Sequence, residues 1–291
     1  MIRNSWIILT AFSLSLIVGI TLAAWQGVQD PFPSWSRGRF QQPQNYDDRA
    51  GVPKWENDEQ FKKDVFTFAR VQYDSAYGGR GWGSRGQGRG GKWQTDYPDA
   101  DLNLSYRLKE LTSLKVDPDG VVVRLTDPEL FDYPFIYLIE PGNMLLSEDE
   151  VTALRQYLLK GGFLMVDDFW GEDEWDNFYR EIKRVFPERE PQEIPIEHEI
   201  FHIVYDIDEK PMVPSVHAFL NGYRTERYDA VEAHYRAIFD DNGQIMAFIC
   251  HNTDLGDGWE REGVDERYFH EFSEKFAYPL GINIVTYAMT H

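Results

Sequence analysis

The alternation of short apolar runs with helical stripes between residues 65 and 186 constrains the fold of this chain more than any other feature. Apolar runs bounded by glycine or proline predict four β-strands, at 65–73, 121–126, 135–140 and 163–168. A leucine stripe predicts a helix over 99–114, and a second amphipathic helix over 172–186 ends before Pro187. This order of elements is typical of an α/β protein with a doubly wound, mainly parallel sheet.

Local motifs refine this prediction. Ser147 with Glu150 three residues later forms a capping box, and Gly161 is the expected left-handed stop of the helix that begins there. Alternating runs on both sides of residues 241–243 (Asp-Asn-Gly) predict a hairpin, which is a C-terminal extension of the sheet. We expect the helical stretch after the hairpin to break at 278–281, where Tyr-Pro-Leu-Gly interrupts it.

The first 24 residues are typical of a signal peptide or an N-terminal membrane anchor. Arg3 precedes a run without charge over 7–24, and this run ends in small residues. Residues 25–60 show no sustained period and are interpreted as a linker, which leaves 61–291 as the folded domain. We therefore expect a chain that is exported, periplasmic or anchored in a membrane, with its domain outside the cytoplasm.

Charge and cysteine content exclude several classes of function. Acids outnumber bases 49 to 29, for a net charge of -20, so the phosphate backbone of a nucleic acid would be repelled. Cys250 is the single cysteine and excludes an intrachain disulfide or a cysteine-rich metal site. Because it lies in an apolar run, we expect a buried and inert thiol.

The stretch GGFLMVDDFWGEDEW at 161–175 places two aspartates where a buried strand ends. In open α/β sheets, ligands bind beyond the carboxyl ends of the strands, so Asp167 and Asp168 are candidate ligand-binding residues. Trp170 is a candidate for stacking on a sugar. Two alternatives remain open: the acids complement the positive end of the following helix, and the aromatic residues cover the core.

Two further acidic stretches supply candidate ligand-binding residues. They are Asp96, Asp99 and Asp101 in one stretch, and His251, Asn252, Asp254 and Asp257 in the other. The second stretch mixes a histidine, an amide and carboxylates after a core strand, which suits a polar, hydroxylated ligand. The alternatives are a helix cap for Asp99 and an ordinary turn for the second stretch.

Two motifs suggest chemistry that their context does not favour. The glycine-rich loop 76–93 contains GxGxxG, but about twenty residues separate strand from helix, so a basic flap or a surface loop fits better than a dinucleotide site. HEIFH at 198–202 matches the zinc-protease motif, which requires a helix, whereas prolines precede it and a strand is predicted after it. His198 and His202 with a distant carboxylate remain a candidate site for a divalent metal, and no other cofactor is predicted.

The chain resembles the bacterial family DUF4159 over about residues 64–290. The resemblance is carried by the runs FARVQY, TDYPDADLNL, YPFIYLIEPGN, LRQYLLKGGFLMVDDFWG, HEIFH, CHNTDLGDGW and YPLGINIVTYA. It implies a fold similar to the class I glutamine amidotransferase-like, flavodoxin-like fold. Catalytic amidotransferases have a cysteine in the turn after the central strand, whereas this chain has Asp167 and Asp168 there, so glutaminase activity is not expected. The family name carries no activity, and the resemblance implies no catalytic residue.

Three functions are consistent with these observations. The first is an exported or anchored α/β domain that binds a small polar ligand, such as a carbohydrate, at the rim formed by the strand ends. The second is a hydrolase that depends on a metal or on paired carboxylates. The third is a non-catalytic partner module of an envelope protein complex.

Overall fold

The computed structural model describes residues 49, 51–58, 64–75 and 91–291. The predicted signal or anchor at 1–24, most of the predicted linker and residues 76–90 of the glycine-rich loop lie outside these ranges. The described part of the chain contains no helix that is both long and apolar enough to cross a bilayer.

A seven-stranded sheet forms the centre of the fold, in the order β3-β1-β4-β6-β9-β8-β7. The first five strands in this order are parallel, and the last two run antiparallel to their neighbours. In sequence order the strands are β1 (Ala69–Gln72), β3 (Val121–Arg124), β4 (Phe135–Ile139), β6 (Phe163–Asp167), β7 (Gln192–Glu193), β8 (His234–Phe239) and β9 (Ile245–His251). A separate two-stranded sheet pairs β2 (Asp74–Ser75) with β5 (Met144–Leu145).

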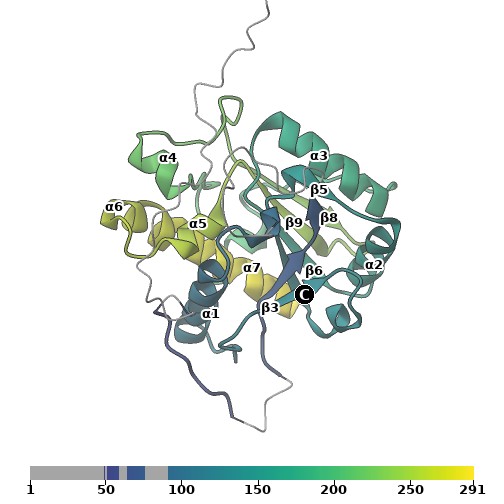
Figure 1. The fold of residues 1–291 in the computed structure, drawn as a ribbon, viewed down its shortest axis with the longest axis horizontal. Helices are drawn as coiled ribbons and strands as arrows, with labels where there is room; N and C mark the ends of the chain where they lie inside the picture. Colours follow the sequence, from purple (N-terminus) through teal and green to yellow (C-terminus); the bar gives the residue numbers. More distant parts are fainter. Residues whose placement is uncertain (1–48, 50, 59–63, 76–90) are drawn as a thin grey trace, which may run out of the picture.

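Helices cover both faces of the large sheet, as Figure 1 shows. The face with α1 (Asp99–Leu111), α5 (Leu255–Glu260) and α7 (Tyr278–Thr290) buries one apolar cluster. The face with α2 (Glu148–Leu159) and α3 (Gly171–Val185) buries another. Alternate residues of β6 enter the two clusters, Phe163 and Met165 in the first and Leu164 and Val166 in the second, as the two-residue repeat of a strand requires. The doubly wound, mainly parallel α/β fold is thereby confirmed.

Local motifs of the sequence are confirmed at α2. The Ser147 side chain accepts a hydrogen bond from the backbone N–H of Glu150, whose carboxylate accepts one from the backbone N–H of Ser147. After the helix, Gly161 adopts φ +94°, the left-handed conformation that glycine tolerates best.

The predicted hairpin is confirmed as β8 and β9, and it extends the parallel sheet, because β9 pairs in parallel with β6. Two other local predictions are corrected by the structure. The C-terminal helix is not broken at 278–281: π-helical residues Phe269–Ala277 continue into α7, and Pro279 lies close to the junction of the two. Residues 203–207 form no strand, because their backbone is held by turn hydrogen bonds and by the side chain of Asn283.

The described part of the predicted linker packs against the domain. The Trp55 indole N–H and the Asn57 side-chain amide both donate to the carbonyl of Val116, at 2.8 Å each. Val116 forms a bridge with Phe66 ahead of β1 and β3, so this contact lies at the amino ends of the parallel strands. The remaining elements are short: α4 (Val216–Leu220), α6 (Glu266–Tyr268), and 3-10 turns at Lys92–Gln94, Pro128–Asp132, Pro141–Asn143 and Glu199–Phe201.

The capping box makes a first prediction. Replacing Ser147 with Ala removes the acceptor for the backbone N–H of Glu150, and we expect the free energy of unfolding to fall by about 1 kcal/mol in urea denaturation. Ser147→Thr retains the acceptor and should lose less than half of this. Ser113→Ala, at an exposed serine outside any helix, is the matched control. An equal loss for Ser147→Ala and Ser113→Ala would contradict a capping role.

Candidate functional site

Three aspartates from separate segments meet beyond the carboxyl ends of the central strands. Asp96 precedes α1, Asp168 follows β6, and Asp254 follows β9. Each offers one carboxylate oxygen, and these oxygens all lie within 4.8 Å of one another. Only 6%, 2% and 0% of the surfaces of Asp96, Asp168 and Asp254 are exposed. We call these three residues the aspartate cluster.

A second acidic group shares Asp96 with the first. Asp96, Asp257 and Glu260 also present oxygens within 4.8 Å of one another. Burial, together with the charges of Asp96 and Asp257, raises the pKa of Glu260 to about 10, and the guanidinium of Arg261 opposes this shift. Burial is thus the larger cause of this shift, and the neighbouring carboxylates add to it.

Unusual backbone conformations position these side chains. Within the described residues, the non-glycine residues with positive φ are Asp96, Glu140, Asp168 and Asn252, at 59°, 50°, 55° and 61°. Glu140, Asp168 and Asn252 directly follow the ends of β4, β6 and β9. Asp96 belongs, like Asp168, to the aspartate cluster. Left-handed backbone costs roughly 1–3 kcal/mol per residue and concentrates at functional sites. The strain is thus located at one end of the sheet.

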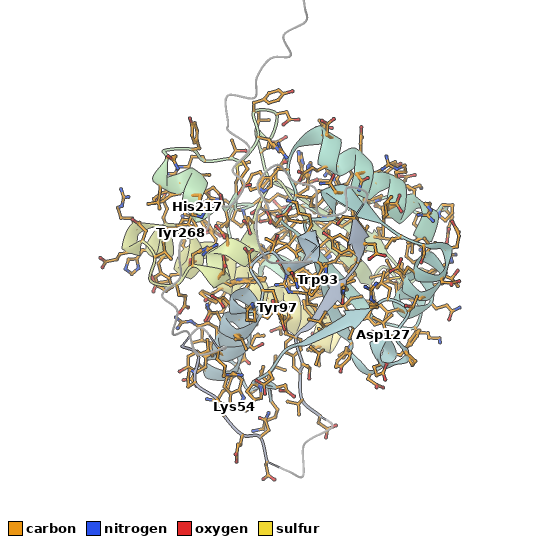
Figure 2. The ribbon with its side chains drawn as sticks, viewed as in Figure 1. Lys54, Trp93, Tyr97, Asp127, His217 and Tyr268 are labelled. Carbon is orange, nitrogen blue, oxygen red and sulfur yellow. The ribbon has the colours of Figure 1, made fainter. Side chains whose placement is uncertain are left out.

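A buried arginine holds the segment that carries Asp96. Arg70 of β1 forms an ion pair with Asp101 of α1, and its remaining N–H groups donate to the carbonyls of Trp93 and Thr95 at 3.1 and 2.8 Å. The guanidinium also lies 5.0 Å from the centre of the Tyr137 ring. Figure 2 labels Trp93 and Tyr97, and the guanidinium of Arg70 lies 5.7 Å from the centre of the Tyr97 ring.

Two residues that were predicted to bind a ligand, Asp99 and Asp101, lie outside the aspartate cluster. Asp101 is engaged by Arg70 and does not join the aspartate cluster. Asp99 is the first residue of α1 and makes no capping hydrogen bond, because Pro98 occupies the N-cap position, so the predicted helix cap at Asp99 is wrong.

Asp167 lies beneath the aspartate cluster, within the core. Its Oδ2 accepts hydrogen bonds from the Tyr137 hydroxyl and from the backbone N–H of Gly256, both at 3.0 Å. Its Oδ1 is buried and accepts no hydrogen bond from the described residues. Burial raises the pKa of Asp167 to about 7, although these hydrogen bonds oppose the shift. The two adjacent aspartates thus have different environments, and only Asp168 joins the cluster.

The aromatic residues of this turn are core residues. Phe169 is fully buried, and Trp170 is 3% exposed, so neither offers a face on which a sugar would stack. The Trp170 indole N–H instead donates to Oδ1 of Asp168 at 3.1 Å. Trp170 therefore orients a member of the cluster.

His251 and Asn252 fix the start of α3. Asn252 Oδ1 accepts from the backbone N–H of Gly171 at 2.9 Å, and His251 Nε2 donates to the Gly171 carbonyl at 3.1 Å. The other ring nitrogen of His251 accepts from Arg236. Burial is the main cause that lowers the pKa of His251 to about 4, so its ring is neutral at pH 7. Both residues support the site without belonging to the aspartate cluster.

The histidines of HEIFH flank a single 3-10 turn, Glu199–Phe201, and do not lie in an α-helix. His198 Nδ1 accepts from the backbone N–H of Ile200, while the His202 ring contacts Asp206 and the Ile196 carbonyl. Neither histidine joins the two groups of metal-compatible side chains found in the described ranges. The zinc-protease geometry is absent from this segment.

A separate hollow of about 280 Å³ lies near the loop after α5. It is lined by Arg107, Glu262, Gly263, Glu266 and Phe269. None of these is a residue predicted from the sequence, and none belongs to the aspartate cluster.

Sequence reasoning missed Arg70 and Tyr137 as residues of this region. An arginine within the apolar run FARVQY was a usable signal, since a charge in a buried strand requires a partner. The tyrosine of FIYLIE carried a weaker signal of the same kind.

The neutral ring of His251 predicts how the free energy of unfolding changes at acid pH. Since folding lowers the pKa from 6.5 to about 4, stability is fully present above pH 6.5 and falls as the pH drops toward 4, by on the order of 3 kcal/mol. We expect the difference in unfolding free energy between the parent chain and His251→Gln to shrink over this interval. Both proteins retain the charged and titratable neighbours that act on position 251, which are Arg236, His234 and Asp229. A difference that does not change with pH would contradict the buried, neutral ring.

Comparison with protein families gives a match. No curated relative matches the chain. The model of the family described as domain of unknown function DUF4159 matches residues 67–289, which include every residue of the aspartate cluster. The chain belongs to the DUF4159 family.

Proposed function

We propose that the aspartate cluster binds a divalent cation and, through it, a small oxygen-rich ligand such as a carbohydrate. The observation that supports this proposal is the convergence of Asp96, Asp168 and Asp254 from three segments, with oxygens within 4.8 Å and hardly any exposure. Carboxylate oxygens suit Mg²⁺, Mn²⁺ or Ca²⁺, whereas zinc and copper favour histidine or cysteine.

Closely spaced carboxylates attract a cation. At 4.8 Å and an effective dielectric constant of about 20, each pair of carboxylates repels by roughly 3 kcal/mol. Arg70 forms an ion pair with Asp101 and also acts electrostatically on Asp96. A bound divalent ion converts this repulsion into attraction, and its remaining coordination positions accept hydroxyl or carbonyl oxygens of a ligand.

Metal-dependent hydrolysis is the second candidate. Glu260 favours it, because this carboxyl group lies beside Asp96 and Asp257 and is 11% exposed, so it can reach a bound ligand. A divalent ion would supply an activated water there. Turnover of generic ester or glycoside substrates would select hydrolysis, and ligand binding without turnover would select the binding protein.

For the location of the protein, we propose export or membrane anchoring, because of the uncharged run at 7–24. The proposed ligand is then an extracytoplasmic one, and an envelope protein is a further candidate partner. Cell fractionation followed by immunoblotting tests this, since a purely cytoplasmic band would contradict export.

Cation binding predicts that Asp168→Asn responds less to a divalent cation than the parent chain does. The asparagine keeps an acceptor for the Trp170 indole N–H. With Mn²⁺ at about 100 times its Kd, the parent should gain about 2.7 kcal/mol, which raises its Tm by roughly 5–10 °C, and the variant should gain much less.

The matched control is Asp132→Asn, at an exposed aspartate of the 3-10 turn Pro128–Asp132. It should respond to Mn²⁺ as the parent chain does. If the parent shows no rise in Tm with millimolar Mg²⁺, Mn²⁺ or Ca²⁺, the proposed cation site is wrong.

A further inference from the structure

A glycine of α5 lies where any side chain would meet the aspartate cluster. Gly256 is the second residue of α5 and follows Asp254 by two positions. A Cβ at Gly256 would lie 2.8 Å from Oδ2 of Asp96 and 2.9 Å from the hydroxyl oxygen of Tyr137. Contacts this short are not accommodated in a close-packed interior, so one of these two neighbours would have to move.

The backbone of Gly256 is fixed beside the cluster. Its N–H donates to Oδ2 of Asp167, the last residue of β6, at 3.0 Å. The side chain of Asp254 caps the same helix, because its Oδ1 accepts from the backbone N–H of Asp257 at 2.7 Å. The first turn of α5 is therefore connected to β6 and to a member of the cluster, and it cannot move away without breaking these hydrogen bonds.

Of the two neighbours, the Asp96 carboxylate is displaced more readily. Tyr137 is fully buried, and its ring centre lies 5.2 Å from that of Phe68 and 5.8 Å from that of Trp259. A ring packed in this way shifts only together with the core around it. A carboxylate at the end of a short side chain can instead rotate about its own bonds. A methyl group at position 256 would therefore turn the carboxylate of Asp96 away.

The required displacement is large on the scale of metal coordination. To restore an ordinary contact of 3.4 Å, Oδ2 of Asp96 must move by about 0.6 Å. Binding constellations tolerate deviations of about 0.5 Å, and metal–ligand distances vary by only about 0.2 Å. Asp96 supplies an oxygen to both acidic groups, so its displacement would alter both of them.

We propose that Gly256 is a positioning residue for the cation site, because its missing side chain leaves the room that the Asp96 carboxylate occupies. This inference rests on the proposed cation site. Gly256 supplies no ligand atom of its own and acts through Asp96.

The first test compares Gly256→Ala with Gly281→Ala in the full chain. Gly281 of α7 is the matched control, since a Cβ there would also meet a neighbour at 2.8 Å, but this neighbour is the ring of Trp259 and not an atom of the aspartate cluster. Isothermal titration calorimetry with Mn²⁺ should give a Kd at least tenfold higher for Gly256→Ala than for the parent chain. For Gly281→Ala we expect a Kd within twofold of the parent value. A Kd within twofold for Gly256→Ala would overturn the positioning role.

Urea denaturation in EDTA tests the close approach without a metal. The effect of Gly256→Ala on the urea midpoint is measured in the parent chain and in Asp96→Gly, which removes the carboxylate and tolerates the left-handed backbone of this position. We expect a less unfavourable change in Asp96→Gly, because helix propensity and the contact with Tyr137 are the same in both backgrounds. Folding of Gly256→Ala only in the Asp96→Gly background would be the extreme form of this coupling.

Equal changes of the urea midpoint in the two backgrounds, or failure to fold in both, would overturn a role that acts through Asp96. Coupling in EDTA together with a parent chain that binds no Mn²⁺ would support the close approach. That result would contradict the cation site and, with it, the positioning role of Gly256.

Discussion

Repulsion among buried carboxylates is the constraint on which the rest of this site depends. Asp96, Asp168 and Asp254 share one small volume, and Asp257 and Glu260 adjoin it. Such an arrangement is unfavourable in a low dielectric medium unless positive charge is present. Asp96 and Asp168 both adopt left-handed backbone there. We base the proposed binding site on this convergence of carboxylates from three segments.

The topology explains how distant residues converge. The strands β4, β6 and β9 are adjacent and parallel, so the turns after them lie at one edge of the sheet. Asp168 and Asp254 reach this edge directly. Asp96 arrives from a different segment, and the buried Arg70 clamp, which connects β1 to α1 and to the carbonyls before Asp96, determines its position.

Much of the fold could be predicted from sequence, because strand and helix periods, the capping box and the turn at 241–243 are local signals. The site could be predicted only in part. The adjacent pair Asp167 and Asp168 was identified, but strand alternation directs Asp167 into the core beneath α5, while the left-handed turn directs Asp168 into the cluster. Likewise, Asp96, Asp99 and Asp101 look equivalent in sequence. They differ only through partners that are distant along the chain, such as Arg70 for Asp101.

Crystals grown with Mn²⁺ and measured at a wavelength where manganese scatters anomalously would test the central claim most directly. The account predicts an anomalous peak bounded by carboxylate oxygens of Asp96, Asp168 and Asp254, at about 2.2 Å from each, and no such peak in Asp168→Asn crystals. A well-ordered parent structure in which these three carboxylates surround no anomalous peak would contradict it.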